Sequence, residues 1–385
     1  MSLPCWRMVW LCLAAAVLVA PPNRRAMAAK VTVITPRQTV AVEEATVDAD
    51  GLWVSPADLT RIHGLVLKPE GVCLDELCIP LSRKPEDAVS AVRDGRTLVN
   101  LTALARQLQQ PVVVDADAGV WSLGAIPPLE RARLDHATAP DFTLRDRQGK
   151  EVRLADFRGK KVLLLTWASW CQCKQDLVGW QKVYEELRDK NFEIVAAAQD
   201  SDGEAAAGPS YDRAKATFTT LIDPEHTVSS LYQMVNVPCG VWIDEQGTIV
   251  RPAEVAYSKD VALLSIKVGG DKYVAALRDW VTHGAQSAYA IPRNELRERL
   301  TPKSETAALA DANFKLAVYF HQQQDQQRAD KYFAAAQQLM PDDWNYHRQQ
   351  WSFTPKTALT RWMEKYRALG DKEYYEPLKL DPAPK

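Results

Sequence analysis

The chain has 385 residues and a formal net charge of −2, with 46% hydrophobic and 25% charged residues. This length predicts two or three domains, and the composition is that of an ordinary globular protein. The near-neutral charge favours neither a nucleic-acid partner nor electrostatic attraction to an anionic membrane. Because the six histidines are scattered along the chain, we expect no histidine-rich metal site, and we predict no bound cofactor.

Residues 1–28 have the pattern of a secretory signal peptide. An apolar run spans residues 8–20, and Ala-Met-Ala at 26–28 fits a cleavage site with small residues. The run is short for a membrane span, although two arginines before the cleavage site leave an uncleaved anchor open. We therefore expect a periplasmic or secreted protein that contacts a membrane only if the signal is retained.

Five cysteines follow the predicted signal, namely Cys73, Cys78, Cys171, Cys173 and Cys239. Disulfides persist in the oxidising compartments to which exported proteins are sent. Two pairs and one odd thiol are the simplest arrangement of these five residues.

Residues 30–124 form a predicted β-rich domain. Two strand-like segments precede two half-repeats, each of which passes from a strand through a short helix into a hairpin. The helical stretches of the half-repeats cover residues 56–63 and 101–109. This order of elements resembles the small N-terminal domain first recognised in copper amine oxidases. The resemblance implies a structural or docking module and implies no copper.

Two cysteines of this domain, Cys73 and Cys78, flank a possible tight turn at Asp75 and Glu76. If these two residues form the turn, the cysteines lie opposite one another on adjacent strands and are close enough to bridge. We therefore predict a structural disulfide in preference to a redox or metal-binding pair.

Residues 125–137 contain two consecutive prolines and several charges, and we predict a linker there. Residues 138–284 then show alternating strands and helices. The nearly continuous apolar run at 162–167 is typical of a buried parallel strand, and 192–198 indicates a second one. An amphipathic helix at 272–282 closes this predicted α/β domain.

Residues 290–385 form a predicted α-helical segment. The spacing of small and aromatic residues over about 306–341 is that of one tetratricopeptide-like repeat, carried by Ala317, Phe320, Ala329, Phe333, Ala336 and Pro341. A single repeat cannot bury its own apolar face. We therefore expect this segment to pack on the central domain or to dock a partner protein.

The central domain resembles the exported redoxin family, which includes the cytochrome-c-maturation thioredoxins and is related to the alkyl hydroperoxide reductase and thiol-specific antioxidant proteins. Three motifs carry the resemblance in the expected order: Ala-Pro-Asp-Phe-Thr-Leu at 139–144, Phe-Arg-Gly-Lys-Lys at 157–161 and Trp-Ala-Ser-Trp-Cys at 167–171. The resemblance implies a thioredoxin-like α/β fold with redox-active cysteines, acting on thiols or disulfides of protein substrates together with a redox partner.

The residue types around Cys171 support this chemistry independently. Cys171 follows a buried strand and opens a predicted helix, whose free N–H groups and partial positive charge favour the nucleophilic thiolate. Trp170 would shield one side of the sulfur. Val237 and Pro238 resemble the cis-proline loop that faces the active cysteine in thioredoxin folds and hydrogen-bonds extended substrates.

The sequence departs from the family motif Cys-x-x-Cys, because only Gln172 separates Cys171 from Cys173. Residues two apart on a helix do not face each other, so a disulfide here is possible in distance but strained in direction, and would be readily reduced. Cys239 follows Pro238 directly and could face Cys171. We hypothesise that Cys171 attacks and that either Cys173 or Cys239 resolves the mixed disulfide.

Three other functions compete with thiol–disulfide exchange. A peroxiredoxin-like peroxidase would need Pro-x-x-x-Thr-x-x-Cys, but Leu164 and Ala168 occupy the proline and threonine positions. A Cu(I) or Zn metallochaperone could use the thiolates of Cys171, Cys173 and Cys239; we expect His226 to be a solvated turn residue and no ligand. The third alternative is a redox-inactive docking module.

Overall fold

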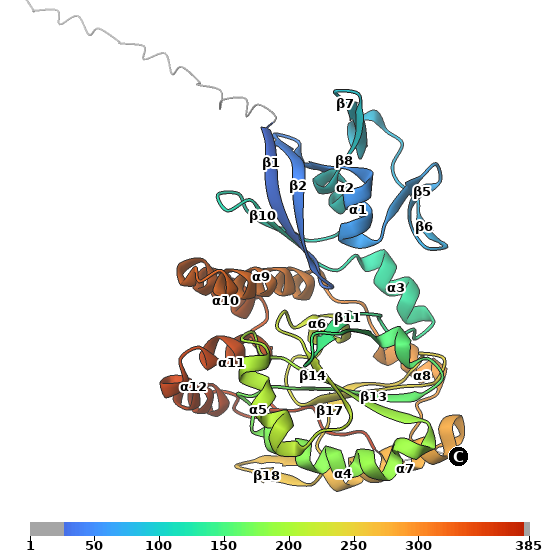
Figure 1. Cartoon of the computed structure of the whole chain (residues 1–385), viewed down its shortest axis with the longest axis vertical. Coiled ribbons are helices and arrows are strands. Elements are labelled where there is room, and N and C mark those ends of the chain that lie inside the picture. The colour runs from blue at the N-terminus through green and yellow to red at the C-terminus, as the bar shows by residue number, and fades with distance from the viewer. Residues whose placement is uncertain (1–26, 381–385) are drawn as a thin grey trace, which may run out of the picture.

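The computed structural model describes residues 27–380 and shows three parts, a sheet-rich N-terminal domain, a central α/β domain and C-terminal helices (Figure 1). Residues 27 and 28, the last two of the predicted signal, begin the first strand, and the rest of that segment lies outside the described residues. Within 27–380, no helix combines the length and apolarity that crossing a bilayer requires.

The N-terminal domain is built on a seven-stranded sheet with the order β7-β8-β3-β2-β1-β10-β9. Helices α1 (Pro56–His63) and α2 (Leu101–Gln107) follow β3 and β8, as the two half-repeats predict. The strands are β1 Met27–Ile34, β2 Thr39–Asp48, β3 Gly51–Val54, β7 Ser90–Arg93, β8 Arg96–Asn100, β9 Val112–Asp115 and β10 Val120–Leu123. The resemblance of this domain to the copper-amine-oxidase module stays a prediction.

A small three-stranded sheet of β4 (Val66–Lys68), β5 (Gly71–Leu74) and β6 (Leu77–Ile79) carries the first cysteine pair. Cys73 lies directly opposite Cys78 in the β5–β6 register, and their sulfurs form a disulfide of 2.04 Å. Asp75 in the connecting turn has φ of 51°, a left-handed conformation that aspartate tolerates in tight turns.

The segment expected to be a linker, 125–137, is largely helical. Its helix α3 spans Pro127–Asp135, and Leu129 joins the buried core of the N-terminal domain. The physical reason is that proline is well accommodated in the first turn of a helix, where its missing N–H needs no partner. The two prolines therefore start a helix here.

The central domain contains a second seven-stranded sheet with the order β12-β11-β15-β14-β13-β16-β17. Strands β13, β14 and β15 run parallel, and β16 and β17 are antiparallel to their neighbours. The strands are β11 Thr143–Asp146, β12 Glu151–Arg153, β13 Lys161–Trp167, β14 Phe192–Ala198, β15 Thr219–Ile222, β16 Cys239–Ile243 and β17 Ile249–Val255. β14 is buried along its whole length, Glu193 included, as expected for the second buried strand predicted at 192–198.

Helices cover both faces of this sheet, which gives the domain two cores. One core holds side chains of α4 (Leu177–Leu187), α5 (Glu204–Ala214) and α7 (Gly270–His283). The other core holds side chains of α6 (Thr227–Tyr232). A two-stranded sheet of β18 (Val261–Leu263) and β19 (Ile266–Val268) precedes α7. This arrangement is the thioredoxin-like α/β architecture expected from the sequence.

The C-terminal part consists of α8 (Arg293–Arg299), α9 (Glu305–Gln322), α10 (Gln326–Leu339), α11 (Trp344–Ser352) and α12 (Pro355–Arg367). The pair α9–α10 lies between the N-terminal sheet and the central domain (Figure 1), and Phe314 of α9 shares a core with Ile34 and Val120. By contrast, Trp344 and Trp351 of α11 join a core of the central domain. The tetratricopeptide-like assignment and the docking role stay predictions.

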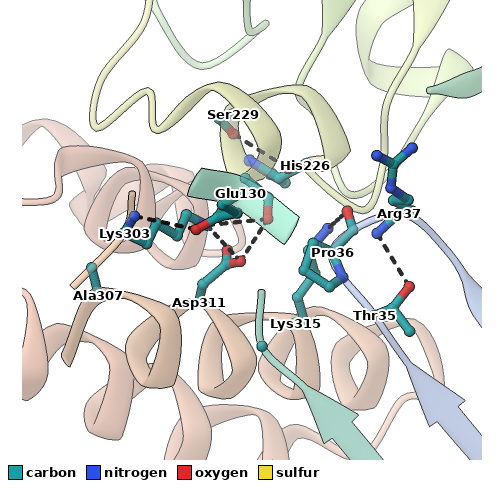
Figure 2. A network of polar contacts seen from close by, with 12 residues as sticks. Thr35, Pro36, Arg37, Glu130, His226, Ser229, Lys303, Ala307, Asp311 and Lys315 are labelled. Atoms are coloured by element: carbon teal, nitrogen blue, oxygen red, sulfur yellow. Dashed lines mark hydrogen bonds and ion pairs between the residues drawn. The ribbon is translucent and has the colours of Figure 1, made fainter. Parts of the chain in front are cut away.

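A buried polar network ties the three parts together (Figure 2). The Lys303 ammonium pairs with the Asp311 carboxylate of α9 at 2.8 Å, and these side chains are 7% and 4% exposed. Ser230 of α6 donates a hydrogen bond of 2.5 Å to Asp311, while the Lys303 backbone N–H donates to Glu130 of α3 at 3.2 Å. Lys315 of α9 adds a hydrogen bond to the carbonyl of Pro36 in the N-terminal domain at 3.3 Å.

We predict that Asp311→Asn lowers the free energy of unfolding by about 3–5 kcal/mol, the usual cost of breaking a buried ion pair from one side. Burial raises the pKa of Asp311, but the positive charges of Lys303 and Lys315 lower it by more. The net pKa lies below the usual value, so the carboxyl stays ionised. Its loss would leave the buried Lys303 ammonium without its ion-pair partner. Urea denaturation of the full chain measures the change.

The matched control is Glu305→Gln, which removes an exposed carboxylate from the same helix and should cost less than about 0.5 kcal/mol. Equal stability losses in the two variants would show that the Asp311 network does not hold the domains.

Candidate active site

Cys171 lies four residues beyond Trp167, the last residue of strand β13, and is 2% exposed. It caps a short 3₁₀ turn, Gln172–Gln175, and the α-helix α4 begins only at Leu177. The helical segment predicted to open at Cys171 therefore begins there as a 3₁₀ turn and continues through Asp176, in αR conformation, into α4. The free Cys173 N–H of this first turn points toward the Cys171 sulfur and favours a negative charge there.

Cys171 and Cys173 are joined by a disulfide in this structure, and both are 2% exposed. Cys171 itself has an extended backbone, with φ of −98° and ψ of 143°, so its side chain does not take the direction that a helical residue would give it. This extended conformation lets the two side chains of the Cys-x-Cys sequence meet. Two helical residues that are two positions apart could not do so, because they do not face each other. The backbone N–H of Cys173 also donates to the Cys171 sulfur at 3.1 Å.

Cys239 does not join this pair. Alternate residues of a strand point to opposite faces, and Cys239 shares a core with Leu164 and Val241, on the face opposite to Cys171 and Cys173. The three sulfurs do not all come within 4.8 Å of one another. Burial and then the negative charge of Glu254 raise the pKa of the Cys239 thiol to about 12. The predicted meeting of three sulfurs is therefore wrong.

The Val237–Pro238 peptide bond is cis, and its loop lies against the cysteine pair. The Cys171 sulfur is 3.7 Å from the Val237 carbonyl oxygen. The same oxygen accepts hydrogen bonds from the Tyr375 hydroxyl at 2.9 Å and from Arg348 Nη1 at 3.3 Å. The backbone acceptor that faces Cys171 is thus already occupied by the C-terminal part of the chain.

Trp170 is half-buried under the same C-terminal part. Its indole N–H donates to Gln349 Oε1 at 3.1 Å, and the Arg348 guanidinium lies 4.7 Å from its ring centroid. Arg348 also donates to Asn236 Oδ1 at 2.8 Å. Arg348, Gln349 and Tyr375 are not predictable from the sequence, because nothing in the local pattern of α11 or of the tail distinguishes them from other helix and loop residues.

Two carboxylates hold the polypeptide on either side of the cysteine pair. Asp200 accepts hydrogen bonds from the Ser169 N–H at 2.9 Å and from its hydroxyl at 2.5 Å, and burial raises the pKa of Asp200 to about 6. Asp176 accepts from the Ser258 hydroxyl at 2.6 Å. A Cβ at Gly179 would lie 1.9 Å from that hydroxyl oxygen, so the close approach of Ser258 requires glycine there.

His226 is not the solvated turn residue that we expected. It is 1% exposed, its Nε2 lies 2.9 Å from Gln349 Oε1, and its ring meets the edge of Phe314 at 4.9 Å between centroids. Burial lowers the pKa of His226 to about 3, so the ring is neutral at physiological pH. The reason is tertiary, since α9 and α11 cover a turn that would be exposed in an isolated central domain.

Among residues 27–380, the cysteines of the redox site do not form a cluster of three possible metal ligands. The one group of three clustered ligand residues there is Glu70, Cys73 and Cys78, and its two cysteines are already joined in a disulfide. The metallochaperone alternative therefore lacks the three-thiolate site on which it was based.

Comparisons with known proteins find similarity over the central domain. Residues 136–251 match the AhpC/TSA family. The thiol-disulfide oxidoreductase ResA of Bacillus thuringiensis subsp. konkukian (strain 97-27) is 28% identical over 125 residues, which cover 32% of this chain and 70% of the relative. The thioredoxin-like protein YneN of Bacillus subtilis (strain 168) is 36% identical over 117 residues, covering 29% of this chain and 66% of the relative.

A solved structure is also similar, that of a putative thiol:disulfide interchange protein DsbE from Chlorobium tepidum. It is 30% identical, with a TM-score of 0.29, over 31% of this chain and 84% of that chain. Each of these matches covers about a third of the present chain. Residues 136–251 are thus similar to the AhpC/TSA family, and the names of the curated relatives are consistent with a thioredoxin-like thiol–disulfide oxidoreductase.

Proposed function

We propose that this protein is an exported oxidoreductase that exchanges disulfides with protein thiols, using Cys171 as nucleophile and Cys173 as resolving thiol. The observation that carries the proposal is the Cys171–Cys173 disulfide held beside the Val237 carbonyl of the cis-proline loop. The signal-like segment 1–28 and the presence of two cysteine pairs support export to an oxidising compartment.

The reduction of a substrate disulfide would proceed in two displacements. The Cys171 thiolate attacks one substrate sulfur, forms a mixed disulfide and expels the other substrate sulfur as a thiolate that takes up a proton. The deprotonated Cys173 then attacks the Cys171 sulfur, and the second substrate thiol leaves. Two electrons pass from the cysteine pair to the substrate, and a dithiol redox partner restores the pair by the reverse steps.

Cys173 is a better resolving thiol than Cys239 on geometric and electrostatic grounds. It is already bonded to Cys171 within one turn, whereas Cys239 lies on the other face of the sheet. With a pKa of about 12, on the order of 10⁻⁵ of Cys239 is thiolate at pH 7. For the peroxidase alternative, Ala168 offers no hydroxyl to orient a peroxide, and it is fully buried.

The cysteine roles predict distinct variants. Cys171→Ser should reduce the rate of exchange with a disulfide-bonded model protein by roughly 100-fold or more, because the nucleophile is lost. Cys173→Ser should instead accumulate a mixed disulfide at Cys171, detected by non-reducing electrophoresis and peptide mass spectrometry. Cys239→Ser is the matched control and should retain exchange. Wild-type turnover by Cys171→Ser, or a mixed disulfide at Cys239, would contradict these assignments.

Labelling of thiols provides a test that needs no substrate. In native, mildly reduced protein at neutral pH, iodoacetamide should leave the peptide containing Cys239 unmodified, because its thiol is buried and its pKa is raised to about 12. After unfolding in urea, the same peptide should be modified completely. Rapid modification of Cys239 in the native protein would show that it is available as a resolving thiol after all.

A further inference from the structure

Arg348 is a buried cation without a negatively charged partner. It is 9% exposed, and its hydrogen bonds go to the amide oxygen of Asn236 and to the carbonyl oxygen of Val237, both of which are neutral. Its guanidinium carbon also lies over the Trp170 ring, 4.7 Å from the centroid. In the described part of the chain, no carboxylate oxygen lies within 4.0 Å of its nitrogens. Burying a charge without a counter-ion is costly, so this arrangement calls for an anion.

The group beside Arg348 that becomes an anion through the chemistry of the site is Cys171. Its sulfur and the Arg348 guanidinium contact the same oxygen, that of Val237, at 3.7 Å and 3.3 Å. In the disulfide form the sulfur is neutral. When the disulfide is reduced, a thiolate at this position supplies the charge that Arg348 lacks.

We propose that Arg348 is the counter-ion of the Cys171 thiolate in the reduced protein. Arg348 is then a positioning residue, supplied to the redox site by helix α11 of the C-terminal part. The inference rests on the proposed function, because it concerns the reduced form of the Cys171–Cys173 pair.

The reductive step balances with a dithiol protein as reductant. The dithiol gives two electrons and becomes a disulfide, and the Cys171–Cys173 bond breaks. One of the two protons of the reducing dithiol passes to the Cys173 sulfur, and the other is released to water. Cys171 keeps the negative charge, which is the charge that Arg348 would neutralise.

The other titratable groups around the pair do not replace Arg348. Burial raises the pKa values of Asp176 and Asp200, and any negative charge on them opposes a thiolate. Burial also raises the pKa values of Tyr257 and Tyr375, so both phenols stay neutral. Lys174 is the second nearby cation, but its ammonium donates to the Ser169 carbonyl at 2.8 Å and lies near the Asp200 carboxylate.

The test measures the pKa of Cys171 directly in the full-length reduced protein. The ultraviolet absorbance of the thiolate is titrated against pH, and the titration of Cys171→Ser is subtracted. Arg348→Met removes the charge and keeps much of the side-chain volume over Trp170. It should raise the midpoint by about one pH unit or more, as expected when an opposite charge is lost near a titrating group. Arg348→Lys keeps the positive charge and should bring the midpoint most of the way back to the wild-type value.

Two controls separate charge from packing. Tyr375→Phe removes the other hydrogen bond to the Val237 oxygen without changing any charge, and Lys174→Met removes the competing cation. Both should leave the midpoint within about 0.3 units of wild type. If Arg348→Met does not fold, Arg348→Gln replaces it, since the amide keeps a donor for Val237.

A second readout follows from the same charge. An Arg348 that stabilises the thiolate favours the reduced form, so Arg348→Met should shift the equilibrium with a glutathione redox buffer roughly tenfold toward the disulfide.

An unchanged midpoint in folded Arg348→Met, or an equal rise in Tyr375→Phe, would overturn the inference. These results are distinguishable from a failure of the proposed function, which would appear as absent exchange by the wild-type protein while its Cys171 midpoint could still be measured.

Discussion

The carbonyl oxygen of Val237 is the point at which the redox pair, the cis-proline loop and the C-terminal part of the chain meet. The sulfur of Cys171 lies against it, and Arg348 and Tyr375 both donate to it. A carbonyl oxygen has two lone pairs, and two donors use both of them here. The surroundings of Cys171 are therefore completed by residues far away in the sequence, and the central domain alone would present a different site.

The flanking domains explain how α11 is kept over this site. The pair α9–α10 packs on the N-terminal sheet through Phe314, and the buried ion pair of Lys303 and Asp311 connects the start of α9 with α6 and α3 (Figure 2). Only the short segment between α10 and α11 then leads to Trp344, whose N–H donates to the Val235 carbonyl at 2.7 Å. The appended parts thus hold helix α11, and with it Arg348, in a fixed position relative to Cys171.

Local sequence patterns were sufficient for the features that depend on neighbouring residues. The buried strands β13 and β14 follow from apolar runs, and the Cys73–Cys78 pairing follows from a two-residue turn. The features that sequence analysis missed depend on distant contacts, such as the burial of His226 beneath α9 and α11. The orientation of Cys239 is an intermediate case, because strand alternation with Val241 and Ile243 could have placed it on the opposite face.

The occupied carbonyl has a consequence for substrates under the proposed function. Cys171 is 2% exposed, and an extended peptide can bond the Val237 oxygen only where Arg348 or Tyr375 has released it. Each neutral hydrogen bond contributes about 1 kcal/mol net, and a charged one about 1.5–3 kcal/mol, so a partner that supplies its own donor can offset the loss. The release of Arg348 would also remove the positive charge from the thiolate. Arg348 therefore both covers the nucleophile and supplies the charge that activates it. This double role favours substrates that displace Tyr375 and leave Arg348 in place.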